Sequence, residues 1–254
     1  MEVTAAMLLT VCPLVFLASL VDAIGGGGGL ISLPAYLVAG LPAQMASGTN
    51  KCSACFGTLL ATIRYGRSGK ILYKPALLAV VGAIPGSFLG SQVQQLLPES
   101  TVRAFMLVAI PLVAVLLLLK RDLSGKPKAM DRKRLTICFF IGLGCGFYDG
   151  FFGPGMGTIL IVLFTWVGGM EAVSASGCAK LVNLASNAAA LASFFMGGYV
   201  LLPLALPATA CSLLGGYLGA NLALKKGAQL IRWVMLGVLA LLIAKLALEF
   251  LGIM

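Results

Sequence analysis

The sequence contains no histidine, and this absence excludes several kinds of site. Without histidine the chain cannot form a Ser-His catalytic pair or a histidine-ligated metal centre, and it also lacks G-x-S-x-G and Walker A motifs. The single C-x-x-C pattern, at Cys52 and Cys55, has no second pair beside it, so we expect neither a metal site nor a cofactor. An intramembrane enzyme built on a Ser-Lys or Asp-Asp arrangement remains a remote alternative.

Charged residues are also scarce, at 10% of the 254 residues, while 60% of the residues are hydrophobic. Soluble domains carry about 25% charged residues. A soluble protein of this length could not hide so many apolar side chains from water, because much of its area remains at the surface. The composition therefore predicts a membrane protein, with the lipid bilayer as its solvent and partner.

Acidic residues are the scarcer of the two charge types, with 8 against 18 lysines and arginines and a net charge of +10. Fourteen of the 18 basic residues fall in three short segments, 64–74, 120–134 and 225–232. Basic loops of membrane proteins face the cytoplasm, so we expect these segments on that side. We expect no nucleic-acid partner, because no basic face extends beyond these loops.

Apolar runs separated by short breaks follow one another along the chain. We expect helices at roughly 5–24, 29–41, 43–64, 71–97, 101–120, 135–152, 155–168, 172–196, 200–224 and 229–251. Crossing the hydrocarbon core takes about 20 helical residues, and 29–41 and 155–168 are too short. The predicted organisation is a first membrane repeat at 1–120, a basic cytoplasmic linker at 121–134 and a second membrane repeat at 135–254.

The two halves resemble each other at fixed offsets. Residues 129 positions apart match at Gly48 and Gly177, Lys51 and Lys180, Gly86 and Gly215, and Gly90 and Gly219. Near the start of each half the offset is 127, where Asp22 aligns with Asp149. A two-residue insertion or deletion between the blocks explains the change. Matches at a fixed spacing predict an internal duplication.

Loop charges indicate how the two halves are oriented. The loop at 64–74 is basic and its counterpart at 193–203 is uncharged, whereas the loop at 94–103 is nearly neutral and its counterpart at 223–232 is basic. If basic loops face the cytoplasm, equivalent loops lie on opposite sides, which defines an inverted-topology repeat. We therefore predict an all-α polytopic membrane protein with two inverted-topology repeats and both termini outside.

Inversion requires an odd number of membrane crossings in each half, and two alternatives stay open. In one, each half crosses five times. In the other, each half has a Gly/Pro-broken or re-entrant hairpin followed by about three full transmembrane helices. The sequence does not choose between them.

Glycine-rich breaks occur at matching places in the two halves, at Gly25–Gly29 and at Gly153–Gly157. Inside a helix, glycine costs about 1 kcal/mol and proline about 3 kcal/mol relative to alanine. Irregular backbone at membrane depth is tolerated only where protein or a water-filled cavity satisfies it. Close helix packing is one explanation, but the paired occurrence favours a binding site.

Two polar clusters that end in lysine lie inside expected spans, Ser47–Lys51 and Ser176–Lys180. Helix N-termini attract anions, and a lysine adds a full positive charge. Asn183 and Asn187 follow Lys180 on the same helix face and add neutral donors. The predicted substrate-binding residues are Gly26, Gly27, Gly28, Gly48, Thr49, Asn50, Lys51, Gly153, Gly155, Ser176, Gly177, Lys180, Asn183 and Asn187.

Asp22 and Asp149 are carboxylates within expected membrane segments. An ionisable group at that depth is a functional candidate. Two interpretations stay open and are compatible: a structural ion pair with Lys51 or Lys180, and a role in proton coupling.

The segments Asp22–Pro34, Ala46–Lys51 and Phe147–Gly157 resemble the sulfite exporter TauE/SafE family, also called the toluene sulfonate uptake permease family. The resemblance extends over almost the whole chain. It implies a bacterial or archaeal inner-membrane transporter of small sulfur-containing oxyanions or organosulfonates, such as sulfite or sulfoacetate. The second half departs from the glycine run at Phe152 and Pro154, so the first half is the better candidate for gripping the anion.

The expected function is therefore secondary transport of a small anionic substrate, coupled to protons, by alternating access at a site near the membrane midplane. A passive anion channel or facilitator is the main alternative. Whether the protein forms a homodimer stays open.

Overall fold

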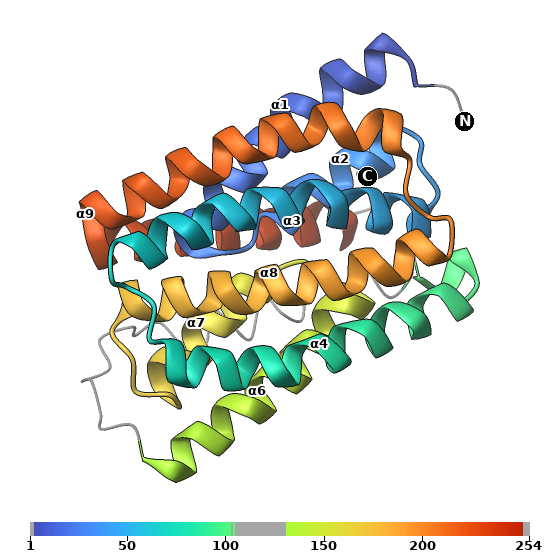
Figure 1. Cartoon of the computed structure of the whole chain (residues 1–254). Helices are drawn as coiled ribbons and strands as arrows, with labels where there is room; N and C mark the ends of the chain where they lie inside the picture. Colours follow the sequence, from blue (N-terminus) through green and yellow to red (C-terminus); the bar gives the residue numbers. More distant parts are fainter. Residues whose placement is uncertain (1–2, 103, 105–130, 251–254) are drawn as a thin grey trace.

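The computed structural model describes residues 3–102, 104 and 131–250, and every helix or strand assigned within them is an α-helix, as predicted. The expected run at 101–120 and most of the linker at 121–134 lie outside the described residues. Figure 1 shows the helices as an elongated bundle. They are α1 (Ala5–Gly25), α2 (Gly29–Val38), α3 (Ala43–Arg67), α4 (Tyr73–Leu96), α6 (Arg132–Phe151), α7 (Met156–Trp166), α8 (Ala172–Met196) and α9 (Leu202–Phe250).

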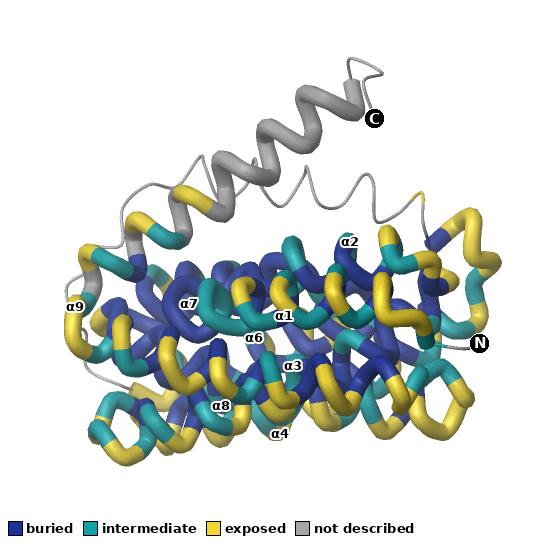
Figure 2. Tube along the Cα trace, turned by 90° about the horizontal axis from the view of Figure 1, so that it is seen from above, coloured by how far each residue is buried: buried dark blue, intermediate teal, exposed yellow. Residues whose placement is uncertain are grey.

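Four described helices are long and apolar enough to cross a membrane: α1, α4, α8 and the Leu202–Gly227 part of α9. Gly227 has a positive φ of 65°, and the kink there separates this part from the rest of α9. Large apolar side chains are exposed, for example Val81 at 59% and Leu89 at 56% on α4. Figure 2 shows exposed residues along the outer faces of the helices. A multi-pass membrane protein accounts for both features, since lipid covers such a surface.

The two short helices cannot cross the membrane alone. Helix α2 has 10 residues and α7 has 11, so each is about 15 Å long, half of a hydrocarbon core of about 30 Å. Each follows a break with left-handed glycines: φ is 77° at Gly26 and 84° at Gly27, and 94° at Gly153 and 83° at Gly155.

Helices from different halves pack closely through glycine. A Cβ atom on Gly86 of α4 would lie 2.3 Å from the carbonyl oxygen of Leu143 in α6, and one on Gly215 of α9 would lie 2.3 Å from that of Phe16 in α1. Such close crossings need a residue without a side chain. In Figure 1, α4 lies beside α6 and α9 beside α1. Each half is therefore packed against helices of the other.

The central helices α3 and α8 have the same length, 25 residues, and begin 129 positions apart. Their chain directions are antiparallel, as two contacts show. Asn187 Nδ2 of α8 lies 3.4 Å from Thr58 Oγ1 of α3. Farther along α8, Phe194 packs instead against Gly48, which lies earlier in α3. Equivalent helices thus run antiparallel at the centre of the bundle.

Candidate functional site

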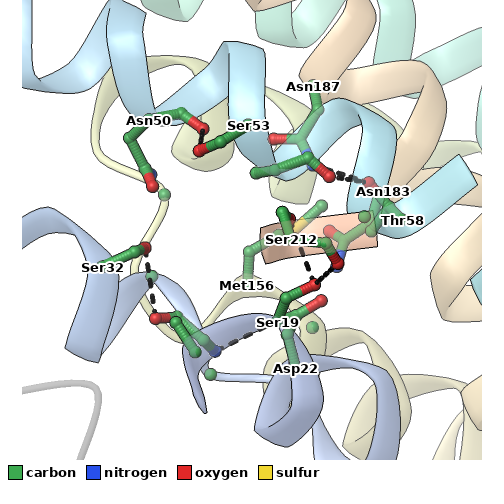
Figure 3. A pocket seen from close by; sticks show the side chains of 18 of the residues that line it. Ser19, Asp22, Ser32, Asn50, Ser53, Thr58, Met156, Asn183, Asn187 and Ser212 are labelled. Atoms are coloured by element: carbon green, nitrogen blue, oxygen red, sulfur yellow. Dashed lines mark hydrogen bonds between the residues drawn. The ribbon is translucent and has the colours of Figure 1, made fainter. Parts of the chain in front are cut away.

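A polar cavity lies where the two helix breaks meet the central helices, and Figure 3 shows the side chains that surround it. The space open to the centre of a water-sized sphere is about 50 Å³, and one ordered water needs roughly 10–15 Å³ on this measure. The cavity therefore has room for a few waters or one small ion. Its lining includes the predicted residues Asp22, Gly27, Gly28, Asn50, Lys51, Asp149, Gly153, Gly155, Asn183 and Asn187.

Lys51 of α3 faces this cavity and is paired across the halves. Its Nζ lies 2.8 Å from Asp149 Oδ1 of α6 and donates to Asn187 Oδ1 of α8 at 3.1 Å. The side chains of Lys51 and Asp149 are 6% and 5% exposed. Asp149 also accepts a hydrogen bond from the Ser186 hydroxyl through Oδ2. A buried ion pair needs such additional hydrogen bonds to offset the loss of water.

Lys180 of α8 forms the second cross-half ion pair, with Asp22 of α1. Its Nζ lies 2.5 Å from Asp22 Oδ2 and 2.6 Å from the backbone carbonyl oxygen of Asp22. Asp22 Oδ1 accepts the amide of Gly28 at 3.2 Å. The Lys180 side chain is fully buried and, unlike Asp22, does not line the cavity. This pair ties α8 to the first helix break.

The two ion pairs occupy equivalent positions but have different surroundings. Ser186 and Asn187, which support the Lys51 pair, correspond at the 129-residue offset to Gly57 and Thr58. Gly57 therefore has no hydroxyl to donate to Asp22, as Ser186 donates to Asp149. The lysines also differ in their second acceptor, which is a backbone carbonyl oxygen for Lys180 and the side-chain oxygen of Asn187 for Lys51. Of the two lysines, Lys51 alone lines the cavity.

The two glycine breaks touch each other. A Cβ on Gly26 would lie 2.2 Å from the amide nitrogen of Thr158 and 2.8 Å from Gly157 Cα, and one on Gly29 would lie 3.2 Å from Pro154 Cα. Close packing thus accounts for Gly26. Neighbouring glycines of both breaks line the cavity, so the N-termini of α2 and α7 open onto it.

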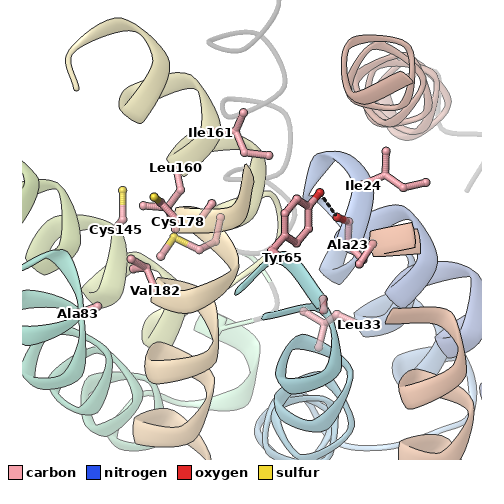
Figure 4. Packing of buried hydrophobic residues seen from close by; sticks show 14 of the residues in the cluster. Ala23, Ile24, Leu33, Tyr65, Ala83, Cys145, Leu160, Ile161, Cys178 and Val182 are labelled. Carbon is pink, nitrogen blue, oxygen red and sulfur yellow. Dashed lines mark hydrogen bonds between the residues drawn. The ribbon is translucent and has the colours of Figure 1, made fainter. Parts of the chain in front are cut away.

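Backbone carbonyls freed by the breaks are satisfied by side chains. Tyr65 donates to the carbonyl oxygen of Ala23 at 3.1 Å (Figure 4), and Thr158 donates to that of Gly25 at 3.0 Å. At the second break, Tyr148 donates to the carbonyl oxygen of Pro154 at 2.6 Å. Irregular backbone away from water needs such partners. These bonds hold both breaks in fixed positions.

Six predicted residues lie outside the cavity lining: Gly26 and Lys180, described above, and four more in the first two turns of α3 and α8. A Cβ on Gly48 would lie 2.3 Å from the carbonyl oxygen of Tyr199, and Thr49 Oγ1 accepts the amide of Leu201 at 3.1 Å. Gly177 packs on the Lys70 carbonyl in the same way, and Ser176 beside it is fully buried. Gly48, Thr49 and Gly177 therefore hold loops of the opposite half.

Several hydroxyl groups in the cavity wall were not predicted from the sequence. Ser19 Oγ donates to the Ser212 carbonyl oxygen at 2.7 Å, and the two hydroxyls lie 3.1 Å apart. Ser32, Ser53 and Thr58 also line the cavity. Ser19 stands one helical turn before Asp22, a spacing that could have indicated it. Nothing in the sequence indicates Ser212, because α1 and α9 meet only in the folded chain.

A multi-pass helical bundle with two broken helices and charged groups inside its core defines a membrane transport protein as a class. The sulfite exporter TauE/SafE family model matches residues 11–246, so the chain belongs to that family. No solved structure matches the chain.

Similar proteins are named as membrane transporters. A probable membrane transporter protein of Haemophilus influenzae is 34% identical over 217 residues, covering 85% of each chain. The probable membrane transporter protein YfcA of Escherichia coli strain K12 is 32% identical over 230 residues, covering 91% of this chain and 86% of the relative. YunE of Bacillus subtilis, also a probable membrane transporter protein, is 24% identical over 251 residues.

Proposed function

We propose that the protein is a secondary transporter that moves small sulfur-containing oxyanions or organosulfonates across the prokaryotic cytoplasmic membrane, coupled to protons. The observation that carries the proposal is the polar cavity between two helix breaks, with Lys51 in its wall. The family description, sulfite exporter, supplies the substrate class.

The chemistry of the cavity wall suits an oxyanion. The N-termini of α2 and α7 open onto it, and helix N-termini carry partial positive charge and unpaired amide N–H groups. Lys51 adds a full charge, and the amides of Asn183 and Asn187 add neutral donors. Asn50 Oδ1 is buried without a hydrogen-bond partner among the described residues. This oxygen only accepts hydrogen bonds, so its partner in a loaded cavity would be a water or a protonated oxygen of the substrate, not an anionic oxygen.

The Lys51–Asp149 pair supports coupling to protons. In this mechanism, an anion that binds Lys51 replaces Asp149 as the partner of the lysine charge, and both side chains are nearly buried. Asp149 would then be a buried carboxylate without a counter-charge, which is very costly. Proton uptake by Asp149 removes that cost. Anion binding and proton binding are therefore linked in this mechanism, with one proton for each anion.

The two ion pairs are related by interchange of the halves, and this relationship supports an inverted-topology repeat. Lys51 pairs with Asp149 and Lys180 with Asp22, so each lysine meets the carboxylate of the other half. Equivalent helices α3 and α8 run antiparallel, as an axis in the membrane plane requires. In this proposal the hairpins α1–α2 and α6–α7 are re-entrant, the termini lie outside, and alternating access arises when one repeat moves against the other.

Flux into proteoliposomes tests the proposal. Labelled sulfite, and then sulfoacetate, would be offered to vesicles holding the protein, with and without an imposed pH gradient. Saturable flux that responds to the gradient is expected, and Arg67→Ala, which removes an exposed charge away from the cavity, should leave it unchanged. Saturable flux that ignores the gradient indicates a facilitator or channel. Absence of flux for both anions contradicts the substrate class.

A further inference from the structure

A groove on the outside of the bundle carries two cations beside apolar side chains. It lies between α1, α3 and α9, at the end of the membrane-spanning part of α9. Its lining consists of Leu20, Arg64, Tyr217, Leu218, Asn221, Leu222 and Lys225. The polar cavity described above shares none of these residues.

Arg64 has no acidic partner within the described part of the chain. Its Nε donates to Asn221 Oδ1 and its Nη1 donates to Ser68 Oγ at 3.2 Å, and both acceptors are neutral. The side chain is half-buried. A guanidinium has five N–H donors, so several remain available on a group whose charge is unmatched. Lys225 adds a second, exposed cation to the same groove.

The equivalent place at the other end of the bundle carries no charge. At the 129-residue offset, Arg64, Asn221 and Lys225 correspond to Ser193, Gln92 and Leu96. Gln92 Nε2 donates to Ser193 Oγ at 3.2 Å, so the same helix contact forms without a cation. Helix packing therefore does not require Arg64 or Lys225.

The rest of the groove is suited to an acyl chain. Tyr217, Leu218 and Leu222 are 48%, 45% and 37% exposed and lie on the helix part that is apolar enough to span the bilayer. The cations thus stand at the head-group end and the leucines at the chain end.

We propose that this groove binds one phospholipid with an anionic head group. The phosphate is held by the free N–H groups of Arg64 and by Lys225, and an acyl chain lies along Leu218 and Leu222. Guanidinium groups bind phosphate through paired hydrogen bonds, and basic pockets between membrane helices bind anionic head groups. The lipid would pack against Leu20, half a turn before Asp22 in α1.

Lipid binding to the purified protein in detergent tests this assignment. Native mass spectrometry would compare phosphatidylglycerol with phosphatidylcholine of the same acyl chains. We expect preferential binding of one phosphatidylglycerol, weakened about tenfold or more by Arg64→Gln. Arg67→Gln is the matched control, because it removes an exposed charge of the same helix end outside the groove. It should leave binding unchanged.

Lys225→Gln is the second variant, in case loss of the Asn221 bond prevents Arg64→Gln from folding. It should weaken phosphatidylglycerol binding while Arg67→Gln does not. Equal loss in the groove variants and in Arg67→Gln would overturn the site, because general attraction to anionic lipid would then suffice. Displacement of the lipid by millimolar inorganic phosphate would show a free-anion site instead. Equal binding of the two lipids would also refute the proposal.

Discussion

Lys51 Nζ and Asp149 Oδ1 lie 2.8 Å apart and join the first half of the chain to the second inside the membrane protein's core. Asn187 and Ser186 bond the two charged groups from α8. The pair therefore holds three helices together and also borders the cavity. The pair is therefore placed both to stabilise the fold and to contact a substrate. Variants that replace both residues can separate the effect on stability from the effect on transport.

A double-mutant cycle on this pair should separate stability from transport. Lys51→Ala leaves Asp149 buried without a counter-charge and should destabilise the protein by about 3–5 kcal/mol. The double variant Lys51→Ala, Asp149→Ala should recover much of that stability, because no charge is left unpaired. Anion flux should be lost in both variants if Lys51 binds the substrate. Unfolding in detergent and flux in proteoliposomes measure the two effects.

The same cycle on Lys180 and Asp22 is the control. Lys180 does not line the cavity, so its double variant should keep some anion binding once stability is restored. Flux that returns in the Lys51, Asp149 double variant would mean that this pair is purely structural.

Asp149→Asn should abolish stimulation of uptake by a pH gradient. The amide keeps a hydrogen-bonding group beside Ser186 but carries no exchangeable charge. Asp22→Asn is the comparison, because Asp22 belongs to the pair whose lysine does not line the cavity. Uptake would be measured with and without the gradient for both variants. Stimulation that survives in Asp149→Asn removes Asp149 from the coupling mechanism.

Gly26→Ala should destabilise the protein by about 3 kcal/mol or more. Gly26 has a φ of +77°, and its Cβ would lie 2.2 Å from the backbone nitrogen of Thr158, so strain and overlap add. Gly69→Ala is matched for backbone conformation, with φ of +67° and nothing within 4 Å of its Cβ. It should cost only about 1 kcal/mol. Similar thermal stability for the two variants would argue against contact between the two breaks.

Tyr65→Phe should cost about 1–3 kcal/mol, because it leaves the buried carbonyl oxygen of Ala23 without a donor. Tyr73→Phe removes a hydroxyl from a residue that is 54% exposed and should have little effect. Thermal unfolding of both variants checks the difference. Because Tyr65 positions the first break, the variant should also lower flux, and a normal flux would show that the break is held by other contacts.

Much of the architecture followed from the sequence, and so did part of the candidate site. Composition predicted a helical membrane protein, and the glycine runs predicted breaks at Gly26 and Gly153, where the chain is left-handed. Gly48 and Gly177 were predicted to bind substrate, but in the structure they pack against loop carbonyl groups of the opposite half. A glycine next to a polar cluster has the same sequence signature whether it faces a ligand or a neighbouring backbone, and only the packing distinguishes them.

The amino-acid sequence by itself determined the membrane environment, the matching positions of the two halves and the places where helices must break, because hydropathy and glycine content act locally along the chain. Tertiary structure decided which lysine meets which carboxylate. It also decided that Lys51 faces the cavity while Lys180 does not. The equivalent lysines have different surroundings because residues on neighbouring helices differ between the halves: Ser186 donates to Asp149 beside Lys51, whereas the residue equivalent to Ser186 in the first half is Gly57, which has no hydroxyl.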